Sequence, residues 1–246
     1  MLFVPSDNYK LSNGDYKEVL DGSFDLIFTS PPYNIGSKAP AKTGRRKYGG
    51  YDAKSFRSIT DYEDDMPEDE YQDSQWKFML WCEQHLSPNG ILVYNHKDRH
   101  KNGRLISPMS WFPDCLALKE KIIWDRRSTH NHCKQYLYQI TEDIYVFTKP
   151  GAPYCIQNHD YDGGANIWRI PRVYKSDHNA PFPIDLANRV IKSWSKEGDL
   201  VCDPYSGSGT VMKACYNLNR RFIGSEKSPK YFKKITEEFS NLLKAA

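Results

Sequence analysis

The sequence predicts an α/β fold with a mostly parallel sheet and helices on both faces. Short apolar runs alternate with helix-length stretches whose apolar residues recur at helical spacing, as they do where helices connect parallel strands. Two motifs rich in proline or glycine directly follow apolar runs, where loops leave a strand. The length of 246 residues is enough for one large domain with a substantial core.

The elements follow from these patterns in chain order. Apolar and aromatic runs predict the strands, and apolar residues at helical spacing predict the helices. The first helix begins after Pro67, because Glu68, Asp69 and Glu70 suit the positive end of a helix dipole. We expect strands at residues 9–13 and 24–28, a helix at 67–85, strands at 90–94, 121–124 and 144–148, a helix at 183–195, a strand at 200–202, a helix at 209–218, a strand at 221–224 and a helix at 229–243.

Two segments, residues 37 to 65 and 150 to 180, fit neither pattern. They are rich in Gly, Pro, Asp, Asn, Tyr and charged residues. Irregular segments of this length inside a domain are usually functional or disordered. The sequence has no internal repeat and no composition change that marks a hinge. We therefore expect one domain over residues 1–246 with two inserted segments.

Overall charge is a weak signal here, because the net charge is only +3 and the isoelectric point is about 8.4. A local basic cluster interleaved with tyrosines carries more weight, since such clusters contact nucleic-acid phosphates. A solvated loop is the alternative interpretation of the same residues. The cluster contains Lys42, Arg45, Arg46 and Lys47.

Cysteine and histidine spacing predicts no metal site. The six cysteines form no Cys-x-x-Cys pair, which favours reduced thiols in a cytoplasmic protein. His96 and His100 are four residues apart without further ligands nearby, so we expect them at the surface or in a groove. No leader and no membrane-spanning run is apparent, so no membrane partner is expected.

The first motif is Ser30-Pro31-Pro32-Tyr33, directly after an apolar strand. Two successive prolines fix φ and lack N–H donors, so the turn presents carbonyl oxygens beside a hydroxyl and an aromatic ring. This arrangement predicts a rigid pocket of hydrogen-bond acceptors.

The second motif runs from Asp203 to Thr210 and contains Gly207 and Gly209 at a strand-to-helix turn. Glycine lets the backbone approach a ligand closely. Glu226 follows the next apolar run, at the distance where dinucleotide-type sites place an acid for a ribose. The two motifs together indicate a catalytic nucleotide-binding site, whereas an ordinary glycine turn is the alternative for the second motif alone.

With these motifs the chain resembles the amino-methyltransferases of DNA, which transfer a methyl group from S-adenosylmethionine to an exocyclic base nitrogen. The catalytic motif precedes the glycine motif, as in the beta group of that family. The resemblance implies a Rossmann-like, S-adenosylmethionine-dependent methyltransferase fold with a circularly permuted motif order. The segments that resemble family motifs are 13–15, 29–33, 86–91, 141–149, 178–183 with Leu186, and 203–210.

The resemblance also implies residue roles. The methionine end of the cofactor is assigned to Asp203, Ser206, Gly207, Ser208 and Gly209. Glu226 would accept from both ribose hydroxyls and Asp15 from the adenine amino group, although Asp15 and Glu226 are also suited to a turn and a helix start. Tyr205 stands where the family usually has phenylalanine, and a ring of similar size should preserve the packing.

For the target base, acceptors at Ser30 and the Pro31 carbonyl are expected to bind the amine hydrogens, with Pro32 rigidifying the turn and Tyr33 stacking on a flipped base. Serine rather than aspartate at position 30 resembles the cytosine-N4-specific subset. Adenine-N6 or RNA methylation and a catalytically inactive nucleotide-binding regulator are the alternatives. Asn34 and Trp124 are each open to a site role or a structural one.

Duplex DNA is the expected partner, with a cognate restriction endonuclease and a second copy of the chain as further partners. Residues 37 to 65 are expected to clamp phosphates through the basic cluster. The segment 150 to 180 is expected to read bases through Arg169, Arg172 and Lys175, beside Trp168 and Tyr174. Because this segment is short, base reading shared with residues 37 to 65 is the alternative.

Overall fold

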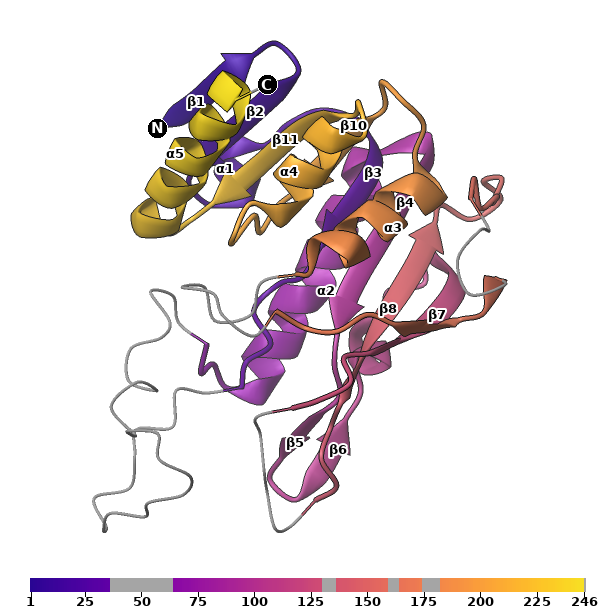
Figure 1. Ribbon diagram of the computed structural model, residues 1–246. Helices are drawn as coiled ribbons and strands as arrows, with labels where there is room; N and C mark the ends of the chain where they lie inside the picture. Colours follow the sequence, from indigo (N-terminus) through magenta and orange to yellow (C-terminus); the bar gives the residue numbers. More distant parts are fainter. Residues whose placement is uncertain (36–63, 130–135, 159–163, 174–181, 246) are drawn as a thin grey trace, which may run out of the picture.

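The computed structural model of the chain describes residues 1–35, 64–129, 136–158, 164–173 and 182–245 (Figure 1). Nearly all of the segment 37–65 and part of 150–180 therefore lie outside the described residues. The strands are β1 (Leu2–Ser6), β2 (Tyr9–Asn13), β3 (Phe24–Thr29), β4 (Leu86–His96), β5 (Arg99–Lys101), β6 (Arg104–Ile106), β7 (Ala117–Asp125), β8 (Thr141–Thr148), β9 (Ile167–Arg169), β10 (Leu200–Asp203) and β11 (Arg221–Glu226). The helices are α1 (Tyr16–Val19), α2 (Glu68–His85), α3 (Ile184–Trp194), α4 (Thr210–Asn217) and α5 (Pro229–Ala245), with a 3-10 turn at Pro108–Trp111.

One nine-stranded sheet runs through the described chain in the order β1-β2-β11-β10-β3-β4-β8-β7-β9. Its centre, from β2 to β4, is parallel. Strand β8 is antiparallel to both of its neighbours, and β1 is antiparallel to β2. The short hairpin of β5 and β6 projects below this sheet (Figure 1).

The chain reverses its winding direction between β10 and β3. From β10 it proceeds through α4 to the neighbouring β11, whereas from β3 it proceeds through α2 to β4 on the other side. Ligands of open α/β sheets bind outside the carboxyl ends of the strands at such a switch point. The topology therefore places the site at the ends of β10 and β3.

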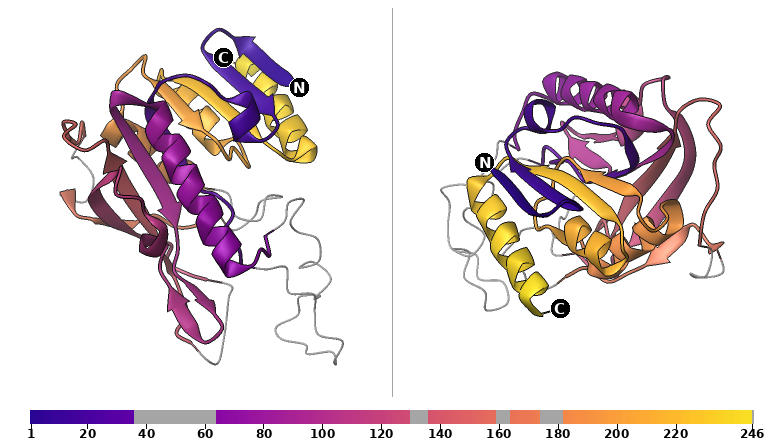
Figure 2. Two further views of the ribbon diagram at one scale, coloured as in Figure 1. Left: turned by 180° about the vertical axis from the view of Figure 1, so that it is seen from behind. Right: turned by 90° about the horizontal axis from the view of Figure 1, so that it is seen from above.

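Helices cover both faces of the sheet, as Figure 2 shows in its view from above. On one face α2 buries Phe78, Met79 and Cys82 against strand residues such as Ile27. The opposite face carries α3, α4 and α5, whose apolar residues form a second buried cluster with the strands. Burial of these large side chains drives the assembly of the layers, and the predicted fold class is confirmed.

Strand β4 is longer than expected because it begins directly at the end of α2. Gly90 is required there, since a Cβ atom at this position would lie 2.7 Å from the Phe24 carbonyl oxygen. The register between β3 and β4 shifts at the same place, between Phe24 and Leu26. The close approach of the two backbones therefore explains the glycine.

Strand β9 lies within the segment that we expected to be irregular. It pairs in parallel with β7, so that Trp124 faces Trp168 in register. Trp168 is buried, stacks on Trp194 and lies under the Arg189 guanidinium. Trp168, the neighbour of the expected base-reading Arg169, therefore belongs to the core.

Candidate active site

The two sequence motifs meet at the switch point. Thr29 ends β3 and donates its hydroxyl proton to Asp203 Oδ1, 2.8 Å away at the end of β10. The same carboxyl oxygen accepts from the backbone N–H of Tyr205. Burial raises the pKa of Asp203 to about 7, despite these two hydrogen bonds that favour its charged form.

The glycine turn after β10 leads into α4. Gly207 and Gly209 have φ angles of 51° and 72°, which L-residues with side chains rarely adopt. A Cβ atom on Gly209 would also lie 2.8 Å from the Ile235 side chain of α5. The Ser206 hydroxyl donates to the Asp203 carbonyl, and the Ser208 hydroxyl pairs with Thr210. Both hydroxyls thus stabilise the turn.

Glu226 ends β11 beside this turn. Its Oε2 accepts from the Gly207 N–H at 2.7 Å, and its Oε1 accepts from the Ser228 N–H at 2.8 Å. Burial raises the pKa of Glu226. Asp15 follows β2, which pairs with β11, and its carboxylate caps α1 at the Lys17 N–H. The structure thus brings Asp15, Asp203 and Glu226 to one edge of the sheet.

This set of acceptors fits the expected cofactor. S-adenosylmethionine carries an ammonium group, two ribose hydroxyls and an adenine amino group, all of which donate hydrogen bonds, and carboxylates are their strongest partners. A carboxylate oxygen can accept more than one hydrogen bond. Glu226 therefore has capacity beyond the two amides that it already binds.

The catalytic motif forms a buried hydrogen-bond network. Ser30 Oγ lies 2.7 Å from the Tyr33 hydroxyl, which donates to Glu142 Oε2 at 2.9 Å. Asn95 Nδ2 donates to Glu142, to the Tyr33 hydroxyl and, at 3.4 Å, to Ser30. Arg126 donates to the other Glu142 oxygen at 2.7 Å. Burial, reinforced by the Glu142 charge, raises the pKa of Tyr33 well above its usual value.

Sequence reasoning missed Asn95, Glu142 and Arg126 as site residues. One sequence feature could have indicated Asn95 and Glu142. Both are polar residues near one end of the apolar run of a strand. Asn95 is near the end of β4, and Glu142 is near the start of the antiparallel β8. Their sequence separation of 47 residues hides this contact.

His96 supports the catalytic turn through the Tyr71 hydroxyl. Its Nε2 lies 2.8 Å from the Tyr71 hydroxyl, which donates to the Pro32 carbonyl at 2.7 Å. His96 is fully buried, so the expected position at the surface or in a groove is wrong for this residue. Burial lowers its pKa to about 3. His100 is exposed and stacks on Tyr136.

Asn34 and Trp124 have structural roles in the described chain. Asn34 adopts a φ angle of 54° and exchanges two hydrogen bonds with the Met66 backbone, while Asp64 accepts from its N–H. Trp124 is buried and donates to the Ile170 carbonyl. The Tyr205 ring packs against Tyr16 and Phe78, which preserves the packing expected of a phenylalanine.

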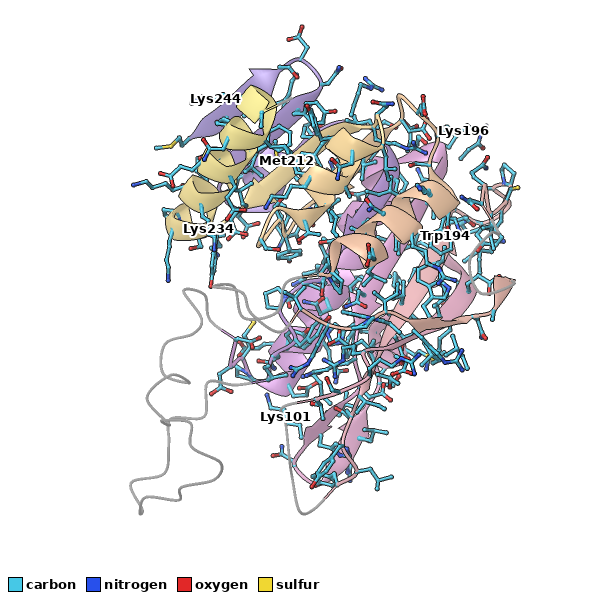
Figure 3. All side chains as sticks on the ribbon, viewed as in Figure 1. Lys101, Trp194, Lys196, Met212, Lys234 and Lys244 are labelled. Atoms are coloured by element: carbon cyan, nitrogen blue, oxygen red, sulfur yellow. The ribbon has the colours of Figure 1, made fainter. Side chains whose placement is uncertain are left out.

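The two expected base-reading arginines lie at the carboxyl ends of the paired strands β7 and β9. Arg169 ends β9 and is exposed, and Arg172 donates to the Ser128 hydroxyl at 3.2 Å. Figure 3 gives the orientation, with Lys101 on the hairpin below the sheet and Lys196 at the opposite end. Tyr174 and Lys175 lie outside the described residues. So does the basic cluster, which consists of Lys42, Arg45, Arg46 and Lys47.

Ionisable side chains of both signs lie along the edge. Asp15, Asp203 and Glu226 lie at the ends of β2, β10 and β11, where Lys227 pairs with Asp15. Cationic side chains follow β4, β7 and β9, and Glu142 pairs with Arg126 among them. Burial and the nearby Arg126 lower the pKa of Lys97, against the opposite pull of Glu142. The cationic residues are Lys97, Arg126, Arg127, Arg169 and Arg172.

Residues 24–238 match the DNA methylase family N6_N4_Mtase. The chain belongs to this family. M.BglI of Bacillus subtilis, a Type II methyltransferase, is 37% identical over 115 residues, which are 44% of this chain and 33% of that protein. The orphan methyltransferase M.BamHII of Bacillus amyloliquefaciens is 27% identical over 91% of both chains. The DNA adenine methyltransferase YhdJ of Escherichia coli K12 is 24% identical over 89% of this chain and 77% of its own.

Solved structures agree with the fold. The cytosine-N4-specific PvuII DNA methyltransferase superimposes with a TM-score of 0.72 at 18% identity, covering 96% of this chain and 91% of its own. TTHA0409 of Thermus thermophilus, complexed with S-adenosyl-L-methionine, gives 0.61 at 24% identity and covers 94% and 93%. The predicted family and the methyltransferase fold are confirmed, and the family confirms S-adenosylmethionine as the cofactor. Within the described part of the chain, helices long and apolar enough to cross a membrane are absent.

Proposed function

We propose that this methylase transfers a methyl group from S-adenosylmethionine to the exocyclic N4 amine of a flipped cytosine in duplex DNA. The observation that carries the proposal is the position of the Ser30 hydroxyl at the switch point, one residue after the contact between Thr29 and Asp203. A hydroxyl stands at this position, and it is linked to the carboxylate of Glu142 through Tyr33 and Asn95.

The chemistry follows from the amine. Its lone pair is delocalised into the base ring, so it is a poor nucleophile until it becomes pyramidal. Ser30 Oγ and the Pro31 carbonyl accept hydrogen bonds from the amine hydrogens and favour the pyramidal form, which is stabilisation of the transition state by preorganised polar groups. Tyr33 supplies the ring beside the base, which must leave the duplex to reach this pocket.

The cofactor, when bound, supplies a methyl group on a sulfonium. Asp203 and the turn of residues 206–209 would hold its methionine end, Glu226 its ribose and Asp15 its adenine. The fixed φ angles of Gly207 and Gly209 keep the turn preorganised. One catalytic domain would thus hold the cofactor at β2, β10 and β11 and the target base beside β3, β4 and β8.

The cationic side chains that follow β4, β7 and β9 suit DNA phosphates and base edges. We assign phosphate contacts to Lys42, Arg45, Arg46 and Lys47, and base reading to Arg169 and Arg172. A cognate restriction endonuclease is a natural partner, because M.BglI is named a Type II methyltransferase. A second copy of the chain is a further proposed partner.

Adenine N6 is the second candidate target. It is favoured by the similarity to YhdJ, which is named a DNA adenine methyltransferase. Cytosine N4 is favoured by Ser30 and by the overlap with the PvuII enzyme, which is named cytosine-N4-specific. The two reactions share the same acceptor chemistry at the amine.

Mass analysis of the product distinguishes these functions. The purified protein is incubated with S-adenosylmethionine and duplex DNA of varied sequence, and the DNA is digested to nucleosides. N4-methylcytosine is the expected product. N6-methyladenine alone would overturn the cytosine assignment, and a lack of any methylated nucleoside would overturn the proposed reaction. Duplex RNA of the same sequence serves as the control for substrate class.

A further inference from the structure

We propose that Glu142 is a positioning residue that sets the direction of the hydrogen bonds from Ser30 through Tyr33, so that Ser30 presents an acceptor to the target amine. This inference rests on the proposed function and deepens it. It assigns a role to a residue on β8, far in sequence from the catalytic motif.

The direction follows from counting protons. The Tyr33 hydroxyl has one proton and donates it to Glu142 Oε2, 2.9 Å away. Ser30 Oγ lies 2.7 Å from the same hydroxyl, so Ser30 must be the donor in that pair. Because the Ser30 proton is committed to Tyr33, the lone pairs of Ser30 are what remains for a substrate.

Glu142 is held so that only an acceptor faces Tyr33. Its Oε1 accepts from Arg126 Nη1 at 2.7 Å, and Arg126 also donates to the carbonyls of Gln139 and Ile140. Asn95 Nδ2 donates to the same Glu142 oxygen as Tyr33 does. Glu142 is 8% exposed and Asn95 is fully buried. Both oxygens of Glu142 are thus paired, and this arrangement is retained because leaving a buried charge without partners is costly.

A glutamine at position 142 would no longer fix the direction. Arg126 only donates, so the amide oxygen of the glutamine would face Arg126 and its NH₂ group would face Tyr33 and Asn95. Asn95 donates to this position in the wild type, so its amide would have to turn, and Tyr33 would share its proton between Ser30 and the Asn95 oxygen. Whenever Tyr33 donates to Ser30, the Ser30 proton is displaced toward the substrate, where it would bind the amine lone pair that has to attack.

The test compares Glu142→Gln, Tyr33→Phe and the double variant. We expect Glu142→Gln to lower kcat for DNA methylation severalfold, with unchanged KM for DNA and unchanged cofactor affinity by calorimetry. Tyr33→Phe keeps the ring and removes only the intervening hydroxyl, so kcat should fall severalfold. The double variant should be no slower than Tyr33→Phe alone, because the Tyr33 hydroxyl that would donate to Ser30 is absent.

The matched control is Asp143→Asn. Asp143 is the next residue on β8 and is also buried, but its carboxylate pairs with Lys121 and the Tyr145 hydroxyl, outside the network. Its kcat should stay near that of the wild type. Thermal unfolding of every variant shows whether the fold is retained.

The inference would be overturned if folded Glu142→Gln had the same kcat as the wild type. It would also be overturned if the fold-loss of kcat in the double variant equalled the product of the two single losses. If Glu142→Gln does not fold, Tyr33→Phe decides alone, and an unchanged kcat in that variant would overturn the inference. Failure of the proposed function looks different, because the wild type itself would then methylate no DNA.

Discussion

At the residue scale, Asp203 combines full burial with a position between the two motifs. The ordinary carboxyl pKa of 3.8 applies to the unfolded chain, and the folded value is about 7. Between these pH values the folded state binds one more proton than the unfolded state, so stability falls as pH rises through this window. The destabilisation is complete above about pH 7 and absent below pH 3.8.

Asp203→Asn should therefore stabilise the cofactor-free protein more at pH 8 than at pH 5. The amide oxygen can still accept from Thr29 and Tyr205, so the hydrogen bonds of the site are retained. Thermal unfolding at the two pH values measures the difference, with the exposed Asp114→Asn as the control for lost charge. An equal effect at both pH values would show that Asp203 is already ionised in the fold at pH 5.

Glu226 is expected to bind the ribose hydroxyls while it holds the turn. Glu226→Gln should weaken cofactor binding by roughly 1.5–3 kcal/mol, the cost of losing a charge-assisted hydrogen bond. Calorimetric titration with S-adenosylmethionine measures this loss. The exposed Glu237→Gln makes the same change of charge and should leave the affinity unchanged. Undiminished affinity of Glu226→Gln would mean that the ribose lies elsewhere.

Residue identities alone pointed to Ser30, Asp203, Glu226 and the glycine turn, because the motifs are local in sequence. The roles of Asn95 and Glu142 were not predictable in this way. They meet Tyr33 only because β4 and β8 pair antiparallel, with Asn95 opposite Ile144 in the register. A register between strands is a property of the folded sheet that no single segment carries.

At the element scale, the entry into α4 depends on Gly209. Alanine there would adopt a strained left-handed φ, at a cost of about 1–2 kcal/mol, and its Cβ would also press on Ile235 of α5. Gly198 has a similar φ of 83°, but the place that a methyl group would take there is open space. It therefore serves as the matched control.

Gly209→Ala should accordingly lower the free energy of unfolding by about 1–3 kcal/mol more than Gly198→Ala does, because overpacking adds to the strain. Urea unfolding curves of both variants measure this difference. Equal losses would indicate that α5 shifts freely to accommodate the methyl group.

Most elements were predictable because their apolar patterns are long. The helices α2, α3, α4 and α5 lie close to the predicted ranges. Strand β9 was not predictable, because it has three residues and its stability derives from pairing with β7 and from the packing of Trp168. Tertiary contacts decide the conformation of such short segments.

At the scale of the whole molecule, the motif order and the sheet order agree. The catalytic motif and the glycine motif are separated by 174 residues between Thr29 and Asp203, yet they meet because β3 and β10 are parallel neighbours. The resemblance predicted this permuted order.

Arg169 tests the proposed base reading at the end of β9. Arg169→Ala should relax the sequence preference at one base position, at a cost of about 1–3 kcal/mol in discrimination. Sequencing of methylated sites in a duplex library measures the preference. Lys244→Ala removes the same charge at the far end of α5 (Figure 3) and should change nothing. Equal weakening on all sequences, with a salt dependence lowered by about one unit, would make Arg169 a phosphate contact instead.

We propose that the Ser30 hydroxyl at the switch point activates an exocyclic cytosine amine for methyl transfer. The most direct test of this central claim is the single-turnover rate of N4-methylcytosine formation by the wild type and by Ser30→Ala, at saturating S-adenosylmethionine and duplex DNA. We predict a rate at least about 10²-fold lower for Ser30→Ala, with cofactor affinity unchanged. Equal rates in the two proteins, or a wild type that forms no N4-methylcytosine, would contradict it.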